Sequence, residues 1–76
     1  MRIQILGTGC AKCRELEAMV KKIVDETGAE ASIEKVTDAR EIVGMGVFAT
    51  PAVVIDGTIK SVGGLPTKKD ILSWIS

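Results

Sequence analysis

The stretch that decides the fold is Arg2-Ile3-Gln4-Ile5-Leu6-Gly7-Thr8-Gly9-Cys10-Ala11-Lys12-Cys13. Its first five residues form a short β-rich run, which predicts a strand, and the glycines that follow end it in a tight turn. Apolar residues then recur at helical spacing, at Leu16, Val20, Ile23 and Val24, which predicts an amphipathic helix over roughly Cys10 to Thr27. The two cysteines are therefore expected at the junction of a strand and a helix.

A second strand and a short helix are predicted next. In Ala31–Val36, the apolar Ile33 and Val36 flank two charged side chains, which is typical of a partly exposed strand. Thr37 or Asp38 can cap a helix, so a short helix is expected over about Asp38 to Val43. The first half of the chain is thus predicted to be a βαβ unit with a right-handed parallel crossover.

The second half of the chain is predicted to form a hairpin and a closing helix. The β-branched apolar residues of Ala52–Ile55 favour a buried strand. Asp56-Gly57 is the strongest hairpin signal in the sequence, so Thr58–Val62 should lie antiparallel to that strand. In the closing helix, Thr67 suits the N-cap position and Asp70 the N3 position.

Length and composition restrict the class of protein. The chain has 76 residues, 46% of them hydrophobic and 26% charged, so we expect one folded domain over residues 1–76. Ten Lys and Arg balance ten Asp and Glu, and the aromatic residues are one Trp and one Phe. Neither a basic groove nor a stacking platform for nucleic acid is therefore expected. Because no apolar run is long enough for a membrane span or a signal peptide, we predict a protein of the cytoplasm with no membrane contact.

Cys10 and Cys13 are the predicted catalytic residues. The sequence contains no His, which excludes imidazole-based catalysis and leaves thiol chemistry. Residues three apart on a helix lie close enough for a disulfide to open and close with little backbone movement. The backbone N–H groups at the helix start, at Ala11 and Lys12, and the charges of Lys12 and Arg14 favour a thiolate at Cys10. Cys13 continues the apolar stripe and should face the core, so Cys10 is the expected nucleophile and Cys13 the resolving thiol.

Other interpretations of these residues fit less well. A structural disulfide across four residues would stabilise the fold by only about 2 kcal/mol, and a closed zinc site needs four ligands. The main alternative is a soft-metal carrier that holds Cu(I) between the two thiolates. Small heavy-metal-associated domains, however, usually have a Met before the motif, where this chain has Thr8 and Gly9. Those domains also have a hairpin directly after the first helix, where this chain is predicted to have a strand and a short helix. The glycine-rich turn lacks the third glycine of a dinucleotide-binding motif, because Lys12 stands there.

Cys10-Ala11-Lys12-Cys13 at a helix start is followed, much later in the chain, by Gly46–Ile55 with Thr50-Pro51, a hairpin and Gly63-Gly64. With the closing helix, this pattern resembles small proteins of thioredoxin or glutaredoxin type, closest to the short archaeal and bacterial thioredoxin-like group. The resemblance implies an α/β thioredoxin fold, βαβαββα, with a four-stranded mixed sheet flanked by three helices. It also implies that the Thr50-Pro51 bond is cis, whereas composition alone predicts trans. Thr50 and Pro51 would then lie opposite the cysteines and bind an extended substrate segment.

The resemblance implies a thiol-disulfide oxidoreductase that exchanges electrons with protein disulfide substrates and is reset by a dithiol reductase. No bound cofactor is expected, and we expect a monomer. The sequence departs from the better-known members at several positions. No Trp precedes the motif and no Pro stands inside it, Gln4 stands where many thioredoxins carry a buried acid, and Leu65-Pro66-Thr67 follows Gly63-Gly64 where many glutaredoxins have acidic residues.

Overall fold

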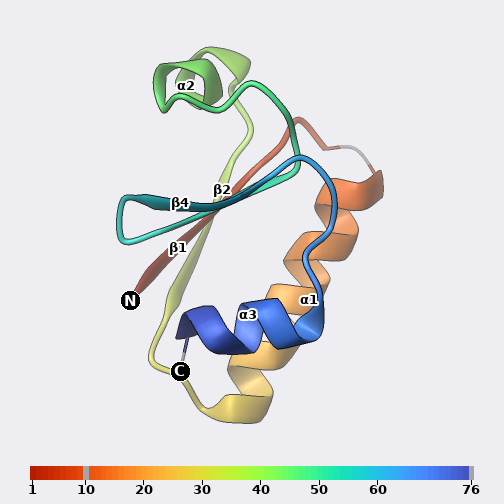
Figure 1. The fold of residues 1–76 in the computed structure, drawn as a ribbon, viewed down its shortest axis with the longest axis vertical. Helices are drawn as coiled ribbons and strands as arrows, with labels where there is room; N and C mark the ends of the chain where they lie inside the picture. The colour runs from red at the N-terminus through yellow and green to blue at the C-terminus, as the bar shows by residue number, and fades with distance from the viewer. Residues whose placement is uncertain (10, 76) are drawn as a thin grey trace.

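The described part of the chain folds into seven elements in the order βαβαββα (Figure 1). The computed structural model describes residues 1–9 and 11–75. Its elements are β1 (Arg2–Leu6), α1 (Ala11–Thr27), β2 (Ser32–Val36), α2 (Ala39–Gly44), β3 (Ala52–Ile55), β4 (Thr58–Val62) and α3 (Lys68–Ile75). The predicted order is confirmed; β2 begins one residue later than expected, and α2 is shifted by one residue. Within these described ranges, no helix is both long and apolar enough to span a bilayer.

The four strands form one mixed sheet in the order β2-β1-β3-β4. β1 lies in the interior of the sheet, parallel to β2 and antiparallel to β3, and β3 forms a hairpin with β4. The register places Leu6 beside Val36 on one side and beside Ala52 on the other. The mixed four-stranded sheet with three helices is the fold that the resemblance implied. The end of β1, where the cysteine motif follows, therefore lies next to the start of β3.

Apolar side chains pack on both faces of the sheet, because successive residues of a strand point to opposite faces. The larger cluster lies between the sheet, α1 and α3, and contains Ile3, Ile5, Leu16, Val20, Ile23, Val53, Ile55, Ile71 and Ile75. The smaller cluster lies on the opposite face and contains Leu6, Ile42, Val47, Ala52 and Val54. Figure 1 shows the corresponding arrangement, with α1 and α3 together on one side and α2 at the end remote from α3.

Side-chain hydrogen bonds fix the starts of the two shorter helices. The Asp38 carboxylate accepts from the Arg40 N–H at 2.8 Å, so Asp38, and not Thr37, is the N-cap of α2. At α3 the Thr67 hydroxyl accepts from the Asp70 N–H, and the Asp70 carboxylate accepts from the Thr67 N–H, both at 3.2 Å. This is the reciprocal capping box that the sequence predicted, and it satisfies donors that the helix leaves unpaired.

Glu17 joins α1 to the edge strand β2. Its carboxylate lies 3.0 Å from Lys21 Nζ, one turn along α1, and 3.0 Å from Lys35 Nζ on β2. Hydrogen bonds from Lys21 and then from Lys35 lower the pKa of Glu17. The carboxylate therefore remains ionised at pH values where an unpaired Glu would begin to take up a proton.

Candidate functional site

The cysteine motif lies at the junction of β1 and α1. The helix begins at Ala11, and Cys10, the expected nucleophile, lies outside the described residues. Ala11 and Lys12 are exposed, whereas Cys13 in the same helical turn is only 6% exposed. The first turn of α1 thus presents Ala11, Lys12 and Arg14 to solvent and keeps the sulfur of Cys13 inside the protein.

Cys13 belongs to the buried face of α1. The other buried residues of this helix are Leu16, Val20 and Ile23, which follow Cys13 at the spacing of one helical face. This observation confirms the inward orientation that the apolar stripe predicted for Cys13. A thiol in this position is shielded from large molecules in solution.

Gly7 approaches Cys13 more closely than a residue with a side chain could. Gly7 is buried directly after β1, and its N–H donates to the Val36 carbonyl at 2.9 Å. A Cβ atom at position 7 would lie 2.3 Å from Cys13 Sγ and 2.9 Å from Cys13 Cβ. The sequence indicated only a turn at Gly7, because spacing along the chain does not show which side chain folds back onto it. The signal that the sequence did contain was a glycine, the smallest residue, at the end of the strand that leads into the motif.

The charges of the first turn of α1 favour an anion beside it. Lys12 and Arg14 are exposed, and this turn contains no acidic residue. The first backbone N–H groups of a helix have no partner within the helix and carry partial positive charge. The sequence predicted that such groups, at Ala11 and Lys12, stabilise a thiolate at Cys10. That role stays a prediction, because residue 10 is outside the described ranges.

The Thr50-Pro51 peptide bond is cis, as the family resemblance implied and composition alone did not. Thr50 is exposed and Pro51 is buried. The Pro51 carbonyl accepts from the Gly63 N–H at 2.9 Å, which fixes this segment to the end of β4. Because Ala52 pairs with Leu6, the segment lies at the same end of the sheet as the end of β1, which leads into the cysteine motif.

A cavity of about 160 Å³ lies beside the turn that precedes the motif and the loop that precedes Pro51. Thr8 lines it from the turn before the motif, and Thr50 lines it from the segment before β3. The remaining lining residues come from α2 and the loop after it, and they are Ala39, Ile42, Val43, Val47, Phe48 and Ala49. Phe48 is 81% exposed, so its ring stands at the rim. Thr50 thus lines the same cavity as Thr8 of the turn that precedes the motif, and the sequence did not indicate this cavity.

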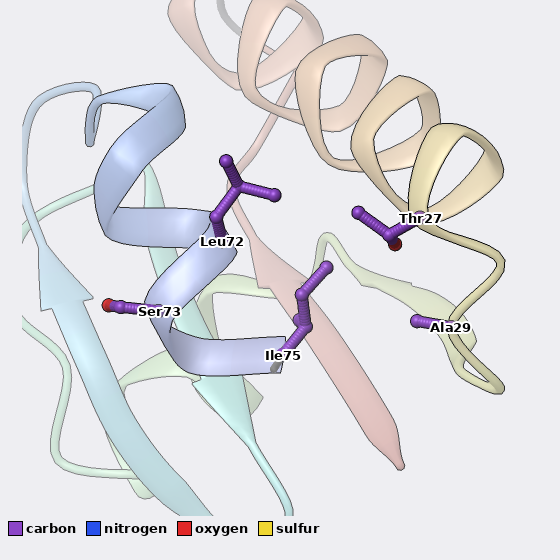
Figure 2. A pocket seen from close by; sticks show the side chains of 5 residues that line it. All are labelled: Thr27, Ala29, Leu72, Ser73 and Ile75. Carbon is purple, nitrogen blue, oxygen red and sulfur yellow. The ribbon is translucent and has the colours of Figure 1, made fainter.

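A larger cavity, of about 440 Å³, lies at the other end of α1 (Figure 2). Its lining residues are Thr27, Ala29, Leu72, Ser73 and Ile75, and Figure 2 shows Leu72 and Ile75 of α3 facing the end of α1. Thr27 lies about 24 Å along the helix from the first residue of α1. None of these lining residues carries a thiol or an ionisable group, so this cavity offers no group for the thiol chemistry that the sequence predicted.

The order of elements does not favour the Cu(I)-carrier alternative. A heavy-metal-associated domain would place a hairpin directly after the first helix. Here α1 is followed by β2, which pairs with β1 in parallel, and then by α2. The hairpin comes later and consists of β3 and β4, as in the thioredoxin-type order that the sequence predicted.

Comparison with known proteins agrees with this geometry. A family model described as a thioredoxin domain matches residues 1–76. A protein named thioredoxin from Methanothermobacter thermautotrophicus is 38% identical over 76 residues, which are 100% of this chain and 99% of that protein. A thioredoxin from Methanocaldococcus jannaschii is 46% identical over 69 residues, which are 91% of this chain and 79% of that protein. The chain therefore belongs to the thioredoxin family, and its function is redox chemistry of the thioredoxin type.

Proposed function

We propose that this protein is a thiol-disulfide oxidoreductase that reduces disulfides of protein substrates with the dithiol of Cys10 and Cys13. Cys10 acts as the nucleophile and Cys13 as the resolving thiol. The observation that carries the proposal is a contrast within one helical turn: Cys13 is 6% exposed, while Ala11 and Lys12 are exposed. A buried second thiol can complete an exchange that another sulfur has begun, but it is poorly placed to begin one with a protein partner.

The first step forms a mixed disulfide. The Cys10 thiolate attacks one sulfur of the substrate disulfide, a bond forms between these two sulfurs, and the S–S bond of the substrate breaks. The second substrate sulfur leaves as a thiolate and takes up a proton from solvent. Lys12, Arg14 and the absence of acidic residues in the first turn of α1 support the ionised state of the attacking sulfur.

The second step closes the disulfide within the motif. Cys13 gives its proton to solvent and attacks the Cys10 sulfur, the Cys10–Cys13 bond forms, and the bond to the substrate breaks. The released substrate sulfur takes up a proton from solvent, and two electrons have then passed from the dithiol to the substrate. A dithiol reductase returns them through the reverse sequence. The cysteines themselves carry the electrons, and the proposed cycle has no bound cofactor.

Thr50 and Pro51 are proposed to bind the substrate segment that contains the disulfide. Thr50 is exposed and lines the 160 Å³ cavity together with Thr8, and among the described residues its backbone has no hydrogen-bond partner. An extended segment can therefore pair with the Thr50 backbone. Phe48 and Val43, which are 81% and 52% exposed, flank the cavity and offer apolar contact to a neighbouring side chain. The proposed substrate is a polypeptide disulfide with an apolar residue beside the attacked cysteine.

A trapping experiment tests the division of roles between the cysteines. Cys13→Ser keeps the thiol that forms the mixed disulfide and removes the thiol that resolves it, so this variant should accumulate a covalent adduct with a disulfide substrate such as insulin. Cys10→Ser should form no adduct and reduce no insulin. Adducts are identified by mass spectrometry under non-reducing conditions, and dithiothreitol should release them. Trapping through Cys13 would reverse the assignment, and an unreactive wild type would refute the function.

We further propose that the protein acts as a single monomeric domain in the cytoplasm. The thioredoxin-domain match covers residues 1–76, which supports one domain. The proposed cycle needs a supply of reductant, and cytoplasmic thiol systems keep cysteines reduced. Sedimentation equilibrium should give a mass near the 8.0 kDa of one chain, and a mass of two chains would refute the monomer.

A further inference from the structure

We propose that Gly7 is a positioning residue for the resolving thiol: Cys13 Sγ occupies the space that a side chain at Gly7 would fill, and this placement sets the equilibrium between the dithiol and the disulfide of the motif. The inference rests on the proposed function, in which Cys10 and Cys13 form a reversible disulfide. Gly7 lies outside the motif, and it meets Cys13 because the first turn of α1 folds back onto the end of β1.

The geometry leaves no room for a side chain at residue 7. An added Cβ would lie 2.3 Å from Cys13 Sγ and 2.9 Å from Cys13 Cβ, whereas ordinary contacts of a Cβ atom begin near 3.4 Å. The sulfur would therefore have to move by about 1 Å to restore an ordinary contact. Rotation of the Cys13 side chain can move the sulfur but not Cys13 Cβ, which is fixed to the helix backbone, so α1 would have to shift as well.

The surroundings of Gly7 direct that movement onto the sulfur. Gly7 is held by its hydrogen bond to Val36 and follows Leu6, which pairs with strands on both sides. Cys13 has little free space, because it is 6% exposed and Leu16, the next residue on its helical face, is 0% exposed. A methyl group at residue 7 thus displaces the sulfur and the first turn of α1 more readily than the interior strand.

This displacement raises the free energy of the disulfide more than that of the dithiol. A disulfide restricts the relative position of its two sulfurs and their Cβ atoms, whereas two separate thiols relax independently. A side chain at position 7 should therefore make the dithiol of Cys10 and Cys13 a weaker reductant. Glycine at position 7 therefore allows the dithiol to reduce the substrate and to form the Cys10–Cys13 disulfide.

The test measures the equilibrium of the dithiol with oxidised glutathione, which yields the protein disulfide and two molecules of reduced glutathione. Gly7→Ala should lower the equilibrium constant at least fivefold. Gly44→Ala is the matched control, because Gly44 is exposed in α2, lacks a positive φ and has nothing within 4 Å of an added Cβ. The constant of this control should equal that of the wild type.

The outcomes separate the inference from the function on which it rests. A wild type that forms the Cys10–Cys13 disulfide, together with a Gly7→Ala constant within twofold of it, would overturn the role of Gly7 alone. A wild type that forms no such disulfide at any ratio of oxidised to reduced glutathione would overturn both the role of Gly7 and the proposed function.

A second measurement tests the contact itself in the reduced protein, even where Gly7→Ala folds poorly. Urea unfolding compares Gly7→Ala with wild type, and Gly7→Ala/Cys13→Ala with Cys13→Ala. Removal of Sγ eliminates the 2.3 Å contact and leaves the one at 2.9 Å, so the fall in urea midpoint should shrink by at least half in the Cys13→Ala background. An equal fall in urea midpoint in both backgrounds would contradict the contact between Gly7 and Cys13 Sγ. A double variant that does not fold, where Cys13→Ala alone does fold, would also contradict it.

Discussion

Removal of Cys10 isolates Cys13 as the one thiol of the chain, and the burial of Cys13 predicts that this thiol reacts slowly. The sequence has two cysteines, so Cys10→Ser leaves a single site for alkylation. If the rate follows accessible area, an exposure of 6% predicts alkylation about seventeenfold slower in the folded protein than in the unfolded one. The comparison of two states of one variant keeps the chemistry of the thiol the same and isolates the effect of burial.

Iodoacetamide at a fixed pH provides the assay. Reduced Cys10→Ser is treated in buffer and in denaturing guanidinium chloride, and the modified fraction is followed by mass spectrometry. Cys13→Ser, treated in the same way, is the matched variant. Its remaining thiol, Cys10, should react faster in the folded protein than Cys13 does in folded Cys10→Ser. A folded-state rate for Cys13 within threefold of the unfolded-state rate would refute the buried, resolving position.

Three further predictions concern stability. Leu16→Ala removes a side chain that is 0% exposed and should cost about 3 kcal/mol, a loss of roughly 12–24 °C in Tm. Leu65→Ala makes the same change at a 37% exposed site and should cost under about 1 kcal/mol; equal losses in Tm would contradict the packing of α1. The lowered pKa of Glu17 predicts a stabilisation that is present at neutral pH and lost as the pH falls through that pKa. The urea midpoints of wild type and Glu17→Gln should therefore differ at pH 7 and converge as the pH falls through the lowered pKa of Glu17, and a difference independent of pH would exclude the ionised carboxylate as its cause. Thr67→Ala breaks the capping box of α3 and should lower the free energy of unfolding by about 1 kcal/mol in urea titrations; an unchanged value would show that the box does not stabilise the fold.

The strands and helices could be predicted because their signals are local. The turn between β3 and β4 is an example: Asp56 and Gly57 have φ values of 49° and 84°, and a two-residue hairpin of type I′ requires positive φ at both positions. The inward orientation of Cys13 was predictable for the same reason, because Leu16 follows it at helical spacing. Each of these features depends on residues within a few positions of one another.

Contacts between distant segments could not be predicted from the residues alone. Thr8 and Thr50 line one cavity although they are far apart in the sequence, and nothing in either segment shows that the other is near. The exposure of Phe48 depends on how the loop after α2 leaves the sheet. The cis bond before Pro51 was expected only through the family resemblance, and the approach of Gly7 to Cys13 was not expected at all.

The interior position of β1 has a consequence for how the molecule opens. Local opening of a sheet begins at its edges, which here are β2 and β4. Backbone amides of β1 and β3 should therefore exchange with deuterated solvent last. Because the cysteine motif follows β1 and Pro51 directly precedes β3, the pairing of these two interior strands keeps both halves of the proposed site at one end of the sheet when an edge frays.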